Sequence, residues 1–477
     1  MPTTGPDKIV IQGKLMYPKI VKNLLFPLHE KIMRRPTFDF AAELGKTQWL
    51  SRDALEQRQL DKLKVLLNIA VAHSPWHAER IYKTQIPLTA NQTLSFTDLA
   101  RLPTMDKSDA QNHREQIAWA GVPGGRSLYN TGGSSGQPLI FYYGKERQAS
   151  DAANRMRARR WWGINVGERE VFLWGAPVEL AKTDRIKQFR DRLMNQLLLN
   201  AFEMSPDSMQ RYIQAIEKFQ PTCIYGYASS LTLFAKHIET QGKLPHLPQL
   251  KVVCTTGEPL YPNQRAIIQR VFGVPVANEY GSRDAGFIAH ESPEGQMLAS
   301  NETMILEILD PSGQPVAAGE IGEAVITGLH SQAQPFIRYR TGDMIKASAE
   351  QCKAGRGLQV IDEVVGRSTD FIVAADGTIM HALAVIYVLR AIEGMGEFKI
   401  IQHSTTELEV QFVPADDYAN DNRWQTVAEQ EITQQLKQRL GQSTNIILKK
   451  TDKIPSEKSG KHRYVVSHVA LPEGYTG

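Results

Sequence analysis

Hydrophobic positions along the chain follow a helical period first and a strand period later. Residues 8–120 carry apolar side chains at helical spacing, as in Asp53–Ala72, which predicts a mainly helical N-terminal region. Between residues 145 and 300, helix-like segments such as Ser208–Phe219 alternate with strand-like segments such as Leu250–Cys254. That alternation predicts an α/β sheet with crossover helices.

The second half of the chain is richer in strand-like segments. Ile305–Leu309, the turn Asp310–Gly313 and Glu323–Thr327 predict hairpins. A smaller α+β unit is expected after about residue 367, with strands at 398–402, 408–413 and 446–450 and a helix near 424–440. We therefore predict a large N-terminal α/β domain with a β-rich subdomain over 1–366, and a small C-terminal α+β domain over 367–477.

Two basic segments have amphipathic character. Lys14–Arg35 places apolar residues against lysines and arginines, so it could lie on an anionic membrane surface. We favour docking on its own domain, and we expect Pro18 and Pro27 to break the helix. The arginines of 155–160, followed by Trp161 and Trp162, are interpreted as a solvated helix face rather than an anion site.

Composition narrows the class of protein. The chain has 477 residues, more than one hydrophobic core usually holds, and 42% hydrophobic and 22% charged residues, which is typical of a soluble globular protein. A net charge of +4 tolerates anionic ligands without indicating nucleic acid. We expect no transmembrane segment and no signal peptide. The three cysteines are isolated, which predicts buried thiols in a cytoplasmic protein.

The stretch Thr131–Leu139 packs glycines and hydroxyl residues together and ends at Pro138-Leu139. Glycines let successive backbone N–H groups point at one anion, and hydroxyls add donors, so the stretch predicts a phosphate-binding loop. A flexible Gly/Ser linker is the simpler alternative. The flanking segments Ser127–Asn130 and Leu139–Tyr143 look like strands, which favours a hairpin lid over a nucleotide.

Two other motifs match the letters of this loop but not its surroundings. Gly132–Gly136 reads G-x-S-x-G, which would make Ser134 the nucleophile of a serine hydrolase. That elbow requires strand, turn and helix, and here a β-rich run follows. A nucleoside-triphosphatase P-loop requires a lysine after the last glycine and a helix after that, and neither is present.

Five further motifs follow in order: Thr255–Pro259, Asn278–Gly286, Phe336–Asp343, Val364–Asp370 and Ile454–Lys461. With the glycine-rich loop, they resemble the adenylate-forming superfamily of acyl-CoA synthetases and adenylation domains. The closer resemblance is to the phenylacetate-CoA ligase branch and its CapK-like members.

The resemblance implies a nucleotide site for ATP built from several stretches. Phosphates would be held by Thr131, Gly132, Gly133, Ser134, Ser135 and Gly136. The adenosine side would be formed by Gly257, Glu258, Pro259, Glu279, Tyr280, Gly281, Ser282 and Asp343. Within this set Tyr280 would stack on adenine, and the two oxygens of Asp343 would accept both ribose hydroxyls. Core packing for Tyr280 and a plain turn for Asp343 are the alternatives.

The catalytic residues implied are Asp284, Arg367 and Lys461. Asp284 would hold Mg²⁺, Arg367 would contact the ribose and α-phosphate, and Lys461 would bind the α-phosphate and the acid. Because Lys461 lies in the small domain, that domain must be mobile, with Arg367–Asp370 as its hinge. The family usually has Glu at position 284, and Asp or Lys where this chain has Thr369. An interface ion pair for Arg367 and a solvated surface position for Lys461 stay open.

The activity implied is activation of a small-molecule carboxylic acid as acyl-AMP, with pyrophosphate release and then acyl transfer. CoA is the expected acceptor. A CapK-like ligase acting on an amine or hydroxyl acceptor is the first alternative, and a non-catalytic nucleotide-binding protein or a hydrolase using Ser134 is the second. Relatives in this branch are often homodimers.

Overall fold

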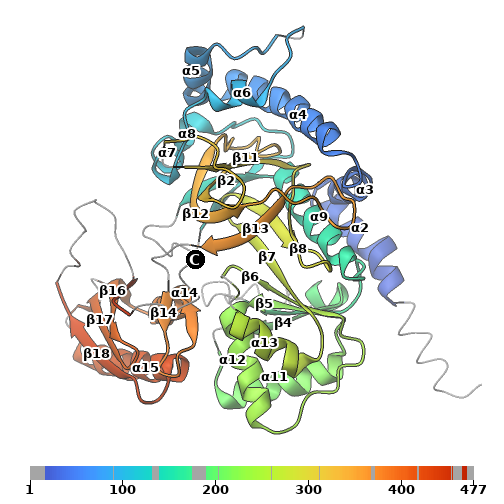
Figure 1. The fold of residues 1–477 in the computed structure, drawn as a ribbon. Helices are drawn as coiled ribbons and strands as arrows, with labels where there is room; N and C mark the ends of the chain where they lie inside the picture. The colour runs from blue at the N-terminus through green and yellow to red at the C-terminus, as the bar shows by residue number, and fades with distance from the viewer. Residues whose placement is uncertain are drawn as a thin grey trace, which may run out of the picture.

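The computed structural model describes residues 17–89, 91–131, 139–174, 190–201, 203–258, 260, 262–310, 312–366, 371–415, 418–419, 421–452, 454 and 465–469. These residues form a large N-terminal part and a smaller C-terminal part, which can be told apart in Figure 1. In the described part of the chain, no helix is both long and apolar enough to cross a membrane.

The N-terminal region is helical, as the apolar spacing predicted. Its helices are η1 (Val21–Leu25), α2 (Phe26–Ile32), α3 (Thr37–Thr47), α4 (Arg52–His73), α5 (Pro75–Thr84), α6 (Phe96–Ala100), α7 (Lys107–Asn112) and α8 (Arg114–Ile117). The prediction that Pro18 and Pro27 break the helix is wrong, because residues 17–32 are helical throughout. Pro18 lies in the first turn of the described helix, where a backbone N–H has no helical partner. Pro27 is the second residue of α2, which begins directly after the π-helical turn η1.

A single mixed sheet forms the centre of the large part. Among the described residues it has eleven strands in the order β10-β11-β12-β13-β9-β8-β7-β6-β5-β3-β4. Its parallel half comprises β3 (Glu170–Trp174), β4 (Gln196–Asn200), β5 (Cys223–Tyr227), β6 (Val252–Thr256) and β7 (Val276–Ser282). The strand order changes direction between β3 and β5. In open α/β sheets, ligands bind at the carboxyl ends of the strands near such a point.

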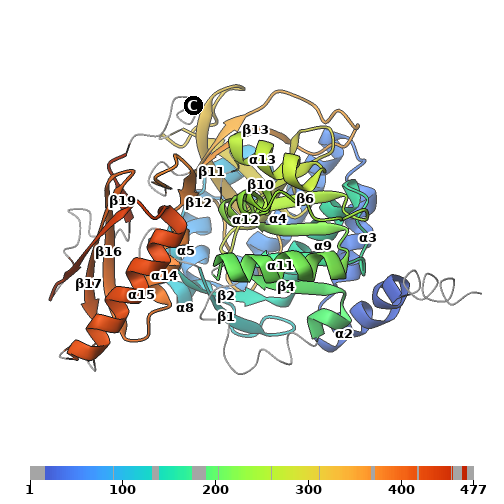
Figure 2. The ribbon, with the colours of Figure 1, turned by 90° about the horizontal axis from the view of Figure 1, so that it is seen from below.

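Crossover helices cover the parallel half (Figures 1 and 2). Helix α9 (Lys145–Trp161), which precedes β3, is not one of them and packs against α3. The crossover helices are α11 (Pro206–Phe219), α12 (Ala228–Thr240) and α13 (Pro262–Phe272). Leu173, Ile224, Leu231 and Ile268 belong to one buried cluster between the sheet and these helices. The predicted alternation of helices and strands is therefore confirmed.

The antiparallel half is the predicted β-rich subdomain. It comprises β8 (Gly286–Glu291), β9 (Met297–Ala299), β10 (Met304–Leu309), β11 (Ile321–Gly328), β12 (Tyr339–Ala347) and β13 (Val360–Gly366). β10 and β11 form the expected hairpin, with Leu309 opposite Glu323. A separate hairpin pairs β1 (Arg126–Asn130) with β2 (Ile140–Gly144). The glycine-rich stretch thus joins two strands, which does not fit the strand–turn–helix of a hydrolase elbow.

The C-terminal part has its own hydrophobic core. It contains β14 (Phe371–Val373), β15 (Ile379–His381), α14 (Leu383–Arg390), β16 (Met395–Ser404), β17 (Glu407–Pro414), α15 (Asn422–Leu440), β18 (Asn445–Lys450) and β19 (Val465–Ser467). The buried cluster of this unit draws all its residues from 372–465, including Ile386, Phe412 and Leu436. The predicted hinge Arg367–Asp370 lies outside the described residues.

The prediction that the arginines of α9 form a solvated face is wrong for two of them. Arg157 is buried and pairs with buried Glu302 at 2.5 Å between Nη1 and Oε1. Arg159 is buried and pairs with Glu170 at 3.1 Å. Removing such charges from water is tolerated because each meets an opposite charge. The three cysteines are buried and free, as expected.

Candidate active site

The predicted motifs meet at the carboxyl edge of β6 and β7. These strands are neighbours and parallel, with Thr256 opposite Glu279, so the segments that follow them lie at the same edge. Gly257 and Glu258 follow β6, and Asp284 follows β7 after Arg283. The strand that the sequence placed at Val274–Ala277 continues through Ser282, so residues 278–282 are held by sheet hydrogen bonds.

Tyr280 and Asp343 bring the second and third motifs together. The Tyr280 hydroxyl donates to Asp343 Oδ2 at 3.1 Å, across 63 residues of sequence. Asp343 follows Gly342, whose φ of +77° is favoured only by glycine, and the register between β11 and β12 shifts beside it. The bulge exposes Gly342 and leaves the Asp343 carboxylate half-buried at the strand surface. The Tyr280 ring is itself buried in the core of the subdomain, so both stacking and core packing stay open for it.

Asp284 is fixed by a residue from the same third motif. The Tyr339 hydroxyl donates to Asp284 Oδ2 at 2.6 Å, and the Tyr339 ring is buried. A hydroxyl bonded to a carboxylate at this distance is a strong, charge-assisted hydrogen bond. The Asp284 side chain is therefore oriented by β12 rather than left free on its loop.

Arg283 connects this edge to the glycine-rich loop. Its Nη1 donates to the Asn130 carbonyl at 3.3 Å, and its guanidinium lies 5.6 Å from the centre of the Tyr129 ring. Asn130 and Tyr129 end β1, directly before Thr131. Thr131 then closes the base of the loop, since its N–H donates to the Leu139 carbonyl and its Oγ1 accepts from the Leu139 N–H, both at 2.9 Å. The loop therefore starts next to Asp284.

Glu258 is held by the start of α12. Its two carboxylate oxygens accept from the Ser229 backbone N–H at 2.7 Å and from the Ser229 hydroxyl at 2.9 Å. Burial raises the pKa of Glu258 to about 7, against the lowering effect of these two bonds. Gly257, at φ +73°, packs so closely that a Cβ would meet the Tyr227 ring at 3.2 Å. The turn after β6 is thus packed against the turn after β5.

Glu279 faces the other side of the sheet from Tyr280, because successive strand residues alternate. Its Oε1 accepts from the Tyr225 hydroxyl at 2.7 Å and from half-exposed Arg155 at 3.2 Å. Burial would raise the pKa of Glu279, but the Arg155 and Arg159 guanidiniums lower it to about 2. The structure thus groups Glu279 with α9 and not with Tyr280 and Asp343.

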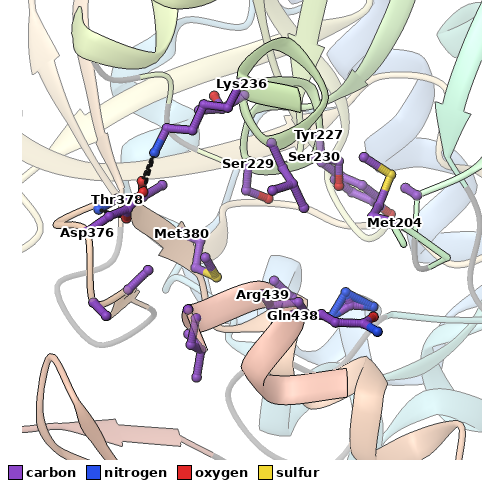
Figure 3. Close-up of a pocket in the computed structure, with 18 of the residues that line it drawn as sticks. Met204, Tyr227, Ser229, Ser230, Lys236, Asp376, Thr378, Met380, Gln438 and Arg439 are labelled. Atoms are coloured by element: carbon purple, nitrogen blue, oxygen red, sulfur yellow. Dashed lines mark hydrogen bonds and ion pairs between the residues drawn. The ribbon is translucent and has the colours of Figure 1, made fainter. Parts of the chain in front are cut away.

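A cavity of about 360 Å³ lies where the two parts of the chain meet (Figure 3). One wall comes from the carboxyl ends of β4, β5 and β6 and includes Met204, Tyr227 and Glu258. The opposite wall comes from the C-terminal part and includes Met380 and Arg439. Beside it, Lys236 of α12 pairs with Asp376 at 2.5 Å and also donates to the Thr378 hydroxyl.

Asp284 is a carboxylate of the kind that a magnesium–nucleotide complex needs. No group of three or more His, Cys, Asp or Glu side chains at metal-binding distance occurs among the residues that the structure describes. Mg²⁺ is usually held by one or two carboxylates with substrate phosphates and water, so half-buried Asp284 beside the loop fits that role.

Around one sheet edge the structure brings together Thr131, Gly257, Glu258, Tyr280, Gly281, Ser282, Asp284 and Asp343. Glu279 lies opposite Thr256 at the same edge, with its side chain on the other face of β7 from Tyr280. Other predicted residues lie outside the described part of the chain: Gly132, Gly133, Ser134, Ser135, Gly136, Pro259, Arg367 and Lys461. Sequence reasoning missed Tyr339 and Arg283, although both stand inside the quoted motifs. It also missed Lys236, for which no motif gave a signal.

Family models match two segments of this chain. Residues 195–332 match the AMP-binding enzyme family, and residues 372–468 match the CapK C-terminal domain. The first match covers the parallel strands and the Tyr280–Asp284 segment, and the second covers the C-terminal part.

Two curated relatives align with most of this chain at low identity. Protein CapK of Staphylococcus aureus is 23% identical, covering 95% of this chain and 98% of its own length. Phenylacetate-coenzyme A ligase of Thermus thermophilus is 23% identical, and the alignment covers 87% of this chain and 97% of that protein. Among solved structures, 2-hydroxyisobutyryl-CoA ligase with 2-HIB-AMP and CoA matches with a TM-score of 0.57 and 20% identity, covering 88% and 91%. At that identity the structural likeness bears on the fold alone.

Proposed function

We propose that this chain, a member of the adenylate-forming ligase family, activates a carboxylic acid with ATP and passes the acyl group to CoA. One observation carries the proposal. Hydrogen bonds from Tyr280 to Asp343, from Tyr339 to Asp284 and from Arg283 to Asn130 join segments that are up to 153 residues apart in sequence. A family resemblance in scattered motifs would carry little weight if those motifs faced different surfaces.

The reaction has two steps. In the first, a carboxylate oxygen of the acid bonds to the α-phosphorus of ATP, the bond to the β-phosphate bridging oxygen breaks, and pyrophosphate leaves. In the second, the acceptor thiolate bonds to the acyl carbon and AMP leaves. Since two anions must meet in the first step, catalysis depends on positioning and on positive charge at the phosphates.

The residues proposed to act are assigned by position. Asp343 would accept the ribose hydroxyls, and the loop after Thr131 would hold the phosphates. Lys461 and Arg367 would bring positive charge to the α-phosphate once the C-terminal domain, proposed to be 367–477, closes on domain 1–366. Asp284 would hold Mg²⁺, which supplies charge neutralisation at the phosphates when bound.

CoA is the proposed acceptor because relatives named as phenylacetate-CoA ligases match most of the chain. An amine or hydroxyl acceptor is the second candidate, and two observations favour it. The C-terminal part matches the CapK C-terminal domain, and this chain aligns with 98% of the length of protein CapK. The buried free cysteines support a cytoplasmic location.

A pyrophosphate-release screen over a library of acids tests the first step. We expect acid-dependent release from the wild type, and near-complete loss in Lys461→Ala with ATP binding retained. A matched control is Lys399→Ala, since Lys399 lies on β16 of the same domain. Release that no acid stimulates, despite ATP binding, would instead indicate a non-catalytic nucleotide-binding protein.

The acceptor is tested by mass. Incubation with ATP, the acid found in the screen and CoA should yield the thioester, and an amine in place of CoA should yield no amide. If hydroxylamine traps an acyl hydroxamate but CoA never gives a thioester, the CoA assignment fails and the acid–amine ligase stands. Covalent labelling of Ser134 by a fluorophosphonate would contradict both.

A further inference from the structure

The N-terminal helical segment, residues 17–32, is docked on the large domain along one face. Val21 is fully buried, and a Cβ on Gly167 would meet the Pro18 carbonyl, so the two backbones are in close contact. Phe26 packs edge-to-face on Phe38 with ring centres 5.8 Å apart. Docking on its own domain, which the sequence favoured, therefore accounts for this face.

The opposite face is apolar, and it is exposed among the residues that the structure describes. Ile20, Leu24, Leu28 and Ile32 follow each other at every fourth position, and their exposed fractions are 40%, 58%, 51% and 70%. Spacing of four places side chains on one side of a helix. We call these four residues the N-terminal stripe. Aligned apolar side chains of this size are unusual on a water-facing helix.

The charges around the stripe are almost all positive. Lys19, Lys31 and Arg34 are exposed beside it. The one acid between residues 17 and 35, Glu30, is buried and is bonded to Arg35 and Thr37. The stripe therefore presents apolar side chains with a rim of cations and no exposed acid.

The apolar surface continues beyond the helix. The Tyr17 hydroxyl donates to the Leu193 carbonyl at 2.9 Å, which places Leu193 at the start of the segment. Leu193 is 39% exposed, and its neighbour Arg192 is exposed as well. The same combination of apolar and basic side chains is thus repeated next to the stripe.

We propose that the N-terminal stripe docks this protein on an anionic membrane surface. A helix that lies in the membrane interface has this division of apolar and basic residues, and its cations attract anionic lipid headgroups. Helix α2 lies on the side away from the C-terminal part in both Figure 1 and Figure 2. Docking there leaves the cavity between the two parts open to the cytoplasmic solution.

Vesicle co-sedimentation of the full-length protein tests the proposal. We expect binding to vesicles of phosphatidylcholine and phosphatidylglycerol, little binding to phosphatidylcholine alone, and weakening by salt. The double variant Leu24→Glu, Leu28→Glu should bind at least about tenfold more weakly, because both leucines lose their apolar burial. Val65→Glu is the matched control, since Val65 is 57% exposed on α4, and it should bind like the wild type.

A second variant covers the case in which the double glutamate variant does not fold. Leu28→Trp should show a blue-shifted emission on adding anionic vesicles. Absence of both sedimentation and the blue shift would overturn the proposal. So would a stable dimer of the wild type that the glutamates dissociate, because the stripe would then be an interface between copies. Pyrophosphate release should be unchanged in the glutamate variant, so this test is independent of the proposed activity.

Discussion

Asp343→Asn is the change that most directly tests the proposed nucleotide site. Asparagine keeps the shape of the side chain and can still accept the Tyr280 hydroxyl bond, which is 3.1 Å long. It removes the negative charge and replaces one acceptor oxygen with a donor. The fold should therefore survive while recognition of the two ribose hydroxyls is weakened.

The size of the effect follows from the hydrogen bonds lost. A hydrogen bond to a charged group contributes about 1.5–3 kcal/mol and a neutral one about 0.5–1.5 kcal/mol. Two ribose hydroxyls would thus lose roughly 2–3 kcal/mol together. At about 1.4 kcal/mol per factor of ten, kcat/KM for ATP should fall about 30- to 140-fold.

The assay is acid-dependent pyrophosphate release with ATP and with dideoxy-ATP, which lacks both ribose hydroxyls. The wild type should prefer ATP strongly, and Asp343→Asn should lose most of that preference. Asp362→Asn, an exposed position on neighbouring β13, is the control and should keep it. If Asp343→Asn discriminates between the two nucleotides as well as the wild type does, Asp343 does not bind the ribose.

Three other changes test the surrounding geometry. Tyr339→Phe removes the 2.6 Å hydrogen bond to Asp284. The magnesium concentration for half-maximal activity should therefore rise several-fold, with a small change in stability. An unaltered magnesium titration would refute this. Glu279→Gln removes the charge partner of Arg155, whose side chain is 42% exposed, and should lower the free energy of unfolding by about 1 kcal/mol in chemical denaturation. A loss within error would show that the pair is not needed. The pKa of Glu258 is raised to about 7 in the folded state, so between about pH 4.5 and 7 the folded protein holds a proton on Glu258 that the unfolded chain has lost. The stability of the wild type should therefore fall by at most about 3 kcal/mol as the pH rises from about 4.5 to above 7. Glu258→Gln should flatten that slope, and a slope equal to that of the wild type would contradict the assignment.

Much of the fold was readable from the sequence because its signals are local. The helix predicted over Asp53–Ala72 occurs as Arg52–His73, and the one predicted over Ser208–Phe219 occurs as Pro206–Phe219. Helical spacing and capping residues such as Ser205, whose side chain accepts from the Ser208 N–H, lie within a few positions of each other. The site motifs were readable for a similar reason, since Gly342 and Asp343 must be adjacent for the bulge to present the carboxylate.

The buried charges on α9 show why the rest was not readable. An arginine-rich helix is typical of a solvated face, and nothing near residues 155–160 signals otherwise. The partners come from other elements of the fold: Glu302 for Arg157, and Glu170 of β3 for Arg159. The local sequence pattern predicts the burial of apolar residues. It does not predict the burial of a charged residue, because that depends on a partner supplied by the tertiary fold. Glu279 was assigned to the nucleotide site because it lies inside a site motif, and its partners on α9 were not visible in the sequence. Its neighbour Tyr280 does face Asp343, but the alternation of β7 turns Glu279 toward the arginines of α9.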